Sequence, residues 1–326
     1  MQREAVEPPP GCDPDSIVLS FSVAREHAGL RLDRFIQSRI PRLSRTRAQI
    51  IVRACAYRDD GSRRRPSERV QAGERVLLVR PPMDEPDAPR EFGVVYEDDD
   101  VLVVDKPAGL PMHPSASYHK NTLTYVLRER YGDGAPQIAH RLDRETSGIV
   151  VCAKHVEAER ALKRCFEDRR TQKRYVAIVR GRVLEAGGRI DAPLGQAEEG
   201  PHVMMGVRAA GDGQSAVTEY EVVERRDAHT LVALRPLTGR QHQLRVHLAS
   251  IGHPIVGDKL YGPEGAAPFL ERIETGLTPA LIARLGHAPH ALHAAALTMP
   301  HPRSEALLAL SAPLPKDLRD LWSRLP

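Results

Sequence analysis

The chain has 326 residues, of which 41% are hydrophobic and 28% charged, and its formal net charge is +4. This composition is typical of a globular protein and excludes a fully disordered chain, while the length favours two domains. No apolar run approaches the roughly 20 residues that cross a bilayer, and the acidic, Pro-rich first fifteen residues lack the apolar stretch of a signal peptide. We therefore expect a cytoplasmic protein with no membrane partner, and we expect a monomer.

The cysteines, at positions 12, 55, 152 and 165, lie far apart. A disulfide framework needs denser cysteines in a secreted chain, and zinc-binding cysteines usually fall two to four residues apart. The histidines form no HExxH pattern, and the chain has no GxGxxG fingerprint and no P-loop. We expect neither a metal nor a cofactor.

Positive charge is concentrated in one segment. Residues 25–80 hold 15 arginines against six acidic residues, a net charge of +9, which leaves −5 for the rest of the chain. Such a concentration is typical of proteins that bind polyanions. Arginine makes up 40 of the 47 basic residues; it pairs bidentately with phosphate, although a genome-wide compositional bias gives the same ratio. The charge pattern favours a nucleic-acid partner.

Residues 1–20 are expected to form a disordered tail, because they are Pro-rich and show no periodicity. Residues 21–80 predict a compact domain that begins with two helices. The first helix ends at Pro41 and has four apolar residues on one face: Leu30, Leu32, Phe35 and Ile36. The second, capped by Ser44, has three: Ile50, Ile51 and Ala54. A turn at Asp60-Gly61 and a strand ending at Val79 complete the domain.

Arginines crowd the second helix of this segment: Arg42, Arg45, Arg47 and Arg53. They form either a solvated helix face or a surface that follows a phosphate backbone. The segments GLRLDRFIQSRIPRLSRTRAQIIVRAC and SERVQAGERVLLV resemble an S4-type RNA-binding domain, which implies the second role. The chain departs from that family at one loop: it has Arg58-Asp59-Asp60-Gly61 where the family usually has a Val-Asn-Gly hairpin.

Residues 81–92 predict an extended Pro-rich and acidic linker, and residues 93–326 a larger domain in which strands and helices alternate. The apolar runs 101–106 and 149–153 predict strands buried on both faces. Residues 155–168 predict an amphipathic helix, and 171–181 and 229–237 two more strands. The fold class is α+β.

The loop His140-Arg141-Leu142-Asp143-Arg144-Glu145-Thr146-Ser147-Gly148 leads directly into the second of these buried strands. It places Asp143 between two arginines, which favour the ionised carboxylate. An ionised, partly desolvated carboxylate is competent as a nucleophile or a base. The alternative is a salt-bridged structural loop. Glu145 is expected at the surface or in a turn.

HRLDRETSG resembles the HRLD-x-x-TSG signature of the RluA-type pseudouridine synthases. KPAGLPMHPS (106–115), QKRYVAIVRG (172–181) and LTGRQHQLRVHLASIGHPIVGDKLYG (237–262) resemble three further motifs of that family, in the same order. The resemblance covers residues 94 to about 312. It implies a pseudouridine synthase catalytic domain with a mixed, largely antiparallel sheet, preceded by a small S4-like domain.

The resemblance also implies roles for named residues. Asp143 is the catalytic nucleophile, Tyr175 lines the active site, and Arg245 pairs with Asp143, with Arg240 as the rival for that pairing. We expect Arg245 on a helix over residues 240–251 whose buried face holds Leu244, Leu248 and Ile251. Four residues are expected to contact the substrate: Arg141, which helps to displace the target base, His140, and Lys106 and His113, which are expected to contact phosphate.

The expected reaction isomerises uridine to pseudouridine in RNA, which requires neither a redox step nor a group donor. An S4-like domain favours large-subunit ribosomal RNA as the substrate, with tRNA as the alternative. A non-catalytic RNA-binding or ribosome-assembly protein is a further alternative, and the set Asp143, Tyr175 and Arg245 argues against it. A glycosidase or another carboxylate hydrolase usually needs paired acids, and the motifs supply one.

Overall fold

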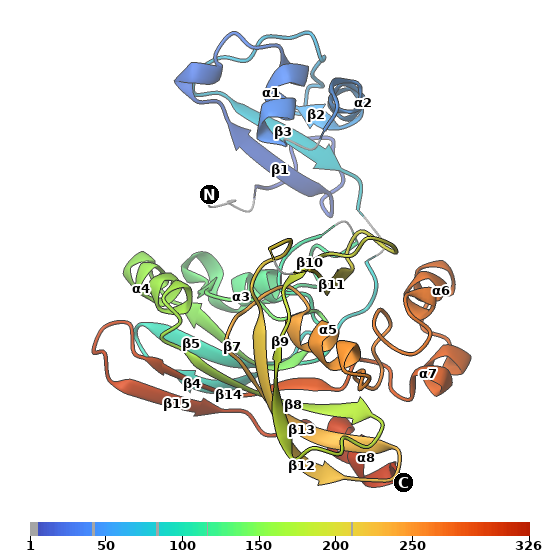
Figure 1. Cartoon of the computed structure of the whole chain (residues 1–326). Coiled ribbons are helices and arrows are strands. Elements are labelled where there is room, and N and C mark those ends of the chain that lie inside the picture. Colours follow the sequence, from blue (N-terminus) through green and yellow to red (C-terminus); the bar gives the residue numbers. More distant parts are fainter. Residues whose placement is uncertain (1–5, 41–42, 83–84, 116, 210) are drawn as a thin grey trace. The chain divides into compact units, whose positions relative to one another are not determined.

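The computed structural model describes residues 6–40, 43–82, 85–115, 117–209 and 211–326 (Figure 1). The chain divides into two compact units, Met1–Glu85 and Pro86–Pro326, and the division falls within the predicted linker. In the described part of the chain, no helix has both the length and the apolar character of a membrane span. Each unit has a hydrophobic core of its own.

The first unit is a three-stranded antiparallel sheet packed against two helices. Its elements in chain order are β1 (Ile17–Ser22), the 3-10 helix η1 (Arg25–His27), α1 (Leu32–Arg39), α2 (Arg45–Cys55), β2 (Ala56–Tyr57) and β3 (Arg75–Arg80). The strand β3 lies between β1 and β2. The expected disordered tail is wrong for residues 17–20, because β1 pairs with β3 along its whole length.

The two helices form as predicted, but their buried faces differ in part. The Ser44 hydroxyl caps α2 by accepting a hydrogen bond from the Arg47 amide at 3.2 Å. Ala48 and Val52 are buried, whereas Ile50 is 55% exposed. A step of two residues turns the chain by about 200°, so Ile50 lies opposite Ala48. Ala54 and Leu30 are exposed as well, and Pro41 lies outside the described residues.

The second unit is built on a ten-stranded sheet. Its strands are β4 (Gly93–Glu97), β5 (Val101–Lys106), β6 (Gln137–Ile138), β7 (Ser147–Ala153), β8 (Gln172–Arg180), β9 (Gly187–Asp191), β12 (Val217–Arg225), β13 (His229–Pro236), β14 (Leu292–Pro300) and β15 (Leu307–Ser311), and a separate hairpin holds β10 (Leu194–Gln196) and β11 (Met205–Val207). Its helices are α3 (Leu123–Tyr131), the 3-10 helix η2 (Gly132–Gly134), α4 (Val156–Glu167), α5 (Gln243–Ser250), α6 (Ala267–Thr275), α7 (Pro279–Leu285) and α8 (Lys316–Arg324).

The sheet has the order β4-β5-β7-β14-β8-β13-β12-β9, with β6 beside β7 and β15 beside β14 (Figure 1). Among the described strands, only β7 and β14 pair in parallel, through two positions, Ser147 with His293 and Gly148 with Ala294. The predicted mixed, largely antiparallel sheet is confirmed. This short parallel pair joins a half made of β4, β5 and β7 to a half made of β8, β13, β12 and β9.

The strands β5 and β7 are buried on both faces, as their continuous apolar runs predict. One face, which includes Val103 and Val151, packs against Leu162 of α4. The other face, which includes Val104 and Val150, packs against Leu127 of α3. The backbone that leads into β7 is therefore held between two hydrophobic cores.

The helix α5 is shorter than predicted, because it begins at Gln243 rather than near residue 240. Before it, the Gln243 side chain accepts hydrogen bonds from the Thr238 hydroxyl at 2.7 Å and the Arg240 amide at 3.0 Å, which fixes a tight turn. Leu244 and Leu248 are buried as predicted, but Ile251 lies beyond the helix and is 36% exposed.

Candidate active site

The loop between β6 and β7 carries Asp143 and is fixed on both sides of it. Leu142 is buried in the core that also contains Leu127 of α3. The carbonyl oxygen of Arg144 accepts hydrogen bonds from the Gly109 amide at 2.9 Å and from the Lys106 amine at 3.0 Å. The backbone on either side of Asp143 is thus anchored, which fixes the position from which the Asp143 side chain extends.

Lys106 is fully buried and does not face a substrate. Its amine donates to the carbonyl oxygens of Pro107 and Leu110, both at 2.9 Å, as well as to that of Arg144. Burial lowers the pKa of Lys106 to about 7. The predicted phosphate contact of Lys106 is therefore wrong, because all three donors are used to hold the KPAGLP segment against the Asp143 loop.

Arg245 lies between two carboxylates. Its guanidinium donates to Asp143 Oδ2 at 2.9 Å and, through two nitrogens, to both oxygens of Asp258 at 2.7 and 2.9 Å. Asp258 also accepts hydrogen bonds from the amides of Leu260 and Tyr261. A bidentate pair fixes the plane of the guanidinium, so Asp258 orients Arg245 and Arg245 in turn orients Asp143.

The Asp143 carboxylate is held in its ionised form. Burial alone would raise the pKa of Asp143, but the charge of Arg245 and its hydrogen bond outweigh burial and lower that pKa below its usual value. The side chain retains 21% of its exposure. A charged, partly desolvated carboxylate with one oxygen occupied by Arg245 leaves Oδ1 available for chemistry.

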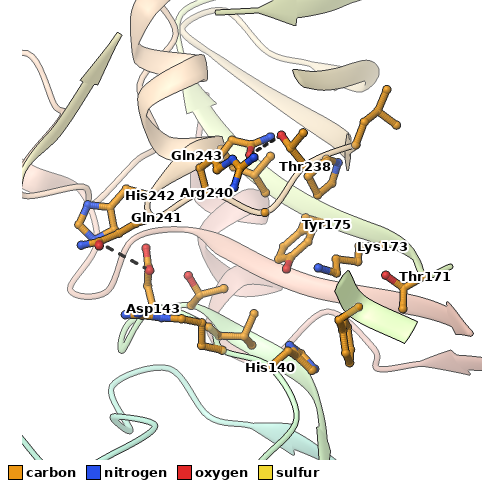
Figure 2. A pocket seen from close by; sticks show the side chains of 18 of the residues that line it. His140, Asp143, Thr171, Lys173, Tyr175, Thr238, Arg240, Gln241, His242 and Gln243 are labelled. Carbon is orange, nitrogen blue, oxygen red and sulfur yellow. Dashed lines mark hydrogen bonds and ion pairs between the residues drawn. The ribbon is translucent and has the colours of Figure 1, made fainter. Parts of the chain in front are cut away.

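His242 approaches the other oxygen of Asp143. Figure 2 shows its ring beside Asp143, and Nε2 lies 3.9 Å from Oδ1. The Tyr261 oxygen accepts the Met205 amide proton at 2.9 Å and lies 2.7 Å from His242 Nδ1. If the Tyr261 hydroxyl donates to Nδ1, the proton of the neutral ring is on Nε2, which faces Asp143. Burial lowers the pKa of His242 to about 4, so the ring is neutral at pH 7.

Tyr175 lies on β8, across the pocket from Asp143 (Figure 2). The pocket has a volume of about 550 Å³. It is lined by the Asp143 loop, the segment from the end of α4 into β8, the turn before α5 together with the start of α5, and Leu292 of β14. Burial and the Asp143 charge raise the pKa of Tyr175, so its hydroxyl stays protonated. A flat ring opposite an ionised carboxylate suits a planar base bound between them.

Comparisons with known proteins agree with this geometry. The family model described as RNA pseudouridylate synthase matches residues 100–250. Ribosomal large subunit pseudouridine synthase D of Xanthomonas campestris is 38% identical over 95% of this chain and 93% of its own length. The protein of the same name from Pseudomonas aeruginosa is 37% identical over 94% of this chain and 95% of its own.

This chain belongs to the RluA family of RNA pseudouridine synthases. Among solved structures, human RNA pseudouridylate synthase domain containing 1 is similar, with a TM-score of 0.55 and 29% identity over 70% of this chain and 86% of that one. The predicted catalytic fold and enzyme class are confirmed.

Glu145 of the synthase was expected at the surface or in a turn; it lies in a turn, but its side chain points into the protein and is largely buried. Its carboxylate pairs with the Lys259 amine at 2.7 Å and with Arg144 at 2.9 Å, and it accepts a hydrogen bond from the His290 amide at 3.2 Å. Burial alone would raise the pKa of Glu145, but these partners, Lys259 above all, lower it to about 2. Glu145 therefore anchors the loop two residues after Asp143.

The other predicted substrate contacts of the synthase lie at different places. Arg141, His140 and Arg240 all line the pocket. The His140 ring accepts the Val151 amide proton at 3.0 Å, and Arg240 donates to the Ser215 carbonyl at 3.1 Å rather than to Asp143. His113 bonds Thr124 and is not among the residues that line the pocket.

The arginines that were predicted to bind RNA through the first unit are largely exposed on α2. Arg45, Arg47 and Arg53 extend to solvent, and Arg42 lies outside the described residues. Arg45 is 51% exposed with its guanidinium 4.0 Å from Asp33. Their exposure leaves these guanidinium groups free to meet solvent or a polyanion.

Three residues of the site were not predicted from the sequence: His242, Tyr261 and Asp258. His242 is one of the few described non-glycine residues with a left-handed backbone, at φ 55°. No spacing rule connects it to Asp143, about a hundred residues earlier. One group in the described chain has metal-like geometry, Asp98, Asp100 and His301. Its ring and carboxylates are already engaged, since His301 bonds Asp98 at 2.9 Å and Arg303 pairs with Asp100 at 2.8 Å.

Proposed function

We propose that the enzyme isomerises uridines of large-subunit ribosomal RNA, with Asp143 as the nucleophile. The observation that carries this proposal is the ionised Asp143 carboxylate, which has one oxygen bound by Arg245 and the other open to a pocket of about 550 Å³. The relatives named ribosomal large subunit pseudouridine synthase D support the choice of RNA, because the similarity extends over both units of the chain.

The reaction breaks the bond between N1 of the uracil and C1′ of the ribose and forms a bond between C5 and C1′. The base must detach, turn and reattach without leaving the pocket. An attack by the carboxylate on the sugar or on the base requires an ionised Asp143, which Arg245 provides. Tyr175 supplies a flat surface on which the detached base can turn.

The uridine must leave its stack to reach Asp143, and such extrusion costs a few kcal/mol. Arg141 is exposed and lines the pocket, so its planar cation is placed to fill the vacated position in the RNA. The first unit, which we propose to be an S4-like domain, holds the RNA through its exposed arginines. Its net charge of +9 over residues 25–80 supports this role.

The decisive experiment combines mapping with one substitution. Pseudouridines are mapped in ribosomal and transfer RNA from cells that lack the gene, and the gene is restored either as wild type or as Asp143→Asn. We expect large-subunit sites that return with wild type and stay unmodified with Asp143→Asn. Purified Asp143→Asn should lose at least about a thousandfold in turnover, because the nucleophile is removed, and retain RNA affinity within about twofold.

Loss of pseudouridine from tRNA alone would overturn the choice of substrate. Substantial turnover by folded Asp143→Asn would overturn the assignment of the nucleophile. The exposed, distant variant Asp133→Asn is the matched control and should behave as wild type.

A further inference from the structure

Buried lysines of this enzyme have partners within the chain, with one exception. Lys106 donates to three carbonyl oxygens, and Lys259 pairs with Glu145 and also donates to the Ala288 carbonyl. Lys173, at the start of β8, is partly buried, but within the described part of the chain its amine has neither a hydrogen bond nor an ion pair. Its contact with the chain is cation–π in type, with the amine 5.1 Å from the centre of the Phe166 ring.

The unpaired amine of Lys173 faces the active-site pocket. Side chains alternate along a strand, so Lys173 shares a face of β8 with Tyr175. Figure 2 shows the two side chains next to each other, and both line the pocket. A Cβ added at Gly239 would lie 3.7 Å from the amine, so Lys173 spans from β8 toward the turn before α5.

The charges around the pocket favour an anion at this position. Three arginines join Lys173 and Arg245 in the pocket lining: Arg141, Arg169 and Arg240. The acidic residues in the lining are Asp143, which Arg245 pairs, and Glu167. Burial lowers the pKa of Lys173, and no carboxylate raises it again, so Glu167 is not its counter-ion.

We propose that Lys173 binds a phosphodiester group of the RNA backbone next to the target uridine. The proposal rests on the proposed function in so far as RNA is the molecule that enters the pocket. A partly desolvated ammonium is compensated best by a full negative charge, and phosphodiesters are the only anionic groups of unmodified RNA. A uracil carbonyl is a neutral acceptor and compensates the charge less.

Because Lys173 lies beside Tyr175, a phosphate bound by Lys173 would be close to the base and sugar that react. A base that stacks near Tyr175 while its glycosidic bond is broken and remade needs its sugar held still. A phosphate bound by Lys173 would fix the backbone within one residue of the reacting sugar, while the base turns. Binding of this kind is made equally in the ground state and the transition state, so it should appear in affinity more than in rate.

The first test uses single-turnover reactions with excess enzyme on the ribosomal RNA fragment that the wild-type enzyme modifies. We expect Lys173→Met to raise the half-saturating enzyme concentration about tenfold and to change the maximal rate less than about threefold. Lys173→Arg keeps the charge and should stay within about threefold of wild type. Arg174→Met is the matched control, because Arg174 is exposed on the opposite face of the same strand, and it should leave both parameters unchanged.

The second test removes the negative charge from the RNA instead. A methylphosphonate, which is neutral, replaces either the 5′ or the 3′ phosphate of the target uridine. At one of these two positions the half-saturating concentration of the wild-type enzyme should rise about tenfold, whereas that of Lys173→Met should rise less than about twofold. This non-additivity identifies the contact. If Lys173→Met has a lower melting temperature than wild type, Lys173→Gln takes its place in the experiment.

The proposal is overturned if Lys173→Met and Lys173→Gln both bind RNA like wild type, or if either variant remains fully sensitive to both methylphosphonates. A variant with normal half-saturation and a collapsed maximal rate would also overturn it, since Lys173 would then act on the base. A wild-type enzyme that modifies no ribosomal RNA fragment would instead refute the proposed function.

Discussion

The arginines of the two units differ in burial and in the contacts that they make. On α2 of the first unit, Arg45, Arg47 and Arg53 extend into solvent and make few contacts. In the second unit, Arg245 is 8% exposed on its side chain and bonds two carboxylates. Exposed charges in water interact weakly and over long range, whereas buried ones fix geometry. The role of an arginine is therefore decided by its burial and its partners rather than by local charge density.

We expect the largest difference between buried and exposed charges in their contributions to the free energy of unfolding. Glu145→Gln removes the partner of buried Lys259, and we expect a loss of about 3 kcal/mol in the free energy of unfolding at pH 7. Glu305→Gln breaks the exposed pair with Arg170 and should cost less than about 1 kcal/mol. Urea titrations of both variants measure the difference, and equal losses would contradict it.

The same pair predicts a pH dependence. In the unfolded chain Glu145 takes up a proton near its usual pKa, about 4.3, whereas in the folded chain its pKa is about 2. Its stabilising contribution is therefore complete above the unfolded pKa and lost as the pH falls toward about 2. The difference in unfolding free energy between wild type and Glu145→Gln should shrink over that window, and a constant difference would show that Glu145 is not held ionised.

In catalysis, we expect the next largest effect from Arg245→Lys. Lysine keeps the charge but lacks the planar fork that joins Asp258 to Asp143, so turnover should fall about fiftyfold with RNA affinity little changed. Arg240→Lys changes an arginine that has no contact with Asp143 and should lower turnover much less. A larger turnover loss in Arg240→Lys than in Arg245→Lys would reverse these roles.

Removal of residues 1–85 tests the exposed arginines together. A chain that begins at Pro86 retains the Asn121 hydrogen bond to the Pro86 carbonyl and all the cores of the second unit. We expect it to fold, to bind ribosomal RNA about thirtyfold more weakly at low salt, and to react slowly at high concentration. Each lost phosphate contact should make the slope of log affinity against log salt shallower by about 0.7 to 0.9. Equal slopes in filter binding would show that these arginines only face solvent.

The smallest catalytic effect is expected from the neutral groups around Asp143. If the Tyr261 hydroxyl donates to His242 Nδ1, Tyr261→Phe removes that donor, so the ring loses its fixed tautomer and turnover should fall about tenfold. Nitrogen-15 chemical shifts of His242, assigned by their absence in His242→Gln, should show a protonated Nε2 in wild type and a mixture in Tyr261→Phe. A protonated Nδ1 in wild type would refute the assignment.

Local sequence patterns predicted the elements better than they predicted the site. The apolar run 101–106 forms β5 with the predicted bounds. A strand that is buried on both faces has a continuous apolar sequence, so its bounds can be predicted from that sequence alone. The buried face of α2 was mispredicted, since Ile50 is exposed at 55% and the smaller Ala48 is buried. Hydrophobicity alone does not say which of two neighbouring faces meets the sheet.

The site itself depends on contacts between distant segments. The motif singled out Asp143, and only the family resemblance implied its pairing with Arg245, 102 positions away. The pairing of Arg245 with Asp258, which requires the turn after α5, was not predicted. Lys106 was predicted to contact phosphate because it is a lysine in a motif, and only the fold shows that carbonyl groups enclose it. The tautomer of His242 likewise depends on Met205 and Tyr261, which no local pattern connects.

Gly148 has a consequence for how the reacting groups are aligned. It adopts φ +109°, and an added Cβ would lie 2.3 Å from the Ala294 carbonyl oxygen, where β7 meets β14. Asp143 belongs to the half of the sheet before this junction, whereas Tyr175 and Arg245 come from the half after it. Any side chain at position 148 would clash with the Ala294 backbone and push β7 away from β14, and with them the two halves of the sheet. A residue with no functional group thus helps to set the spacing between Asp143 and Tyr175.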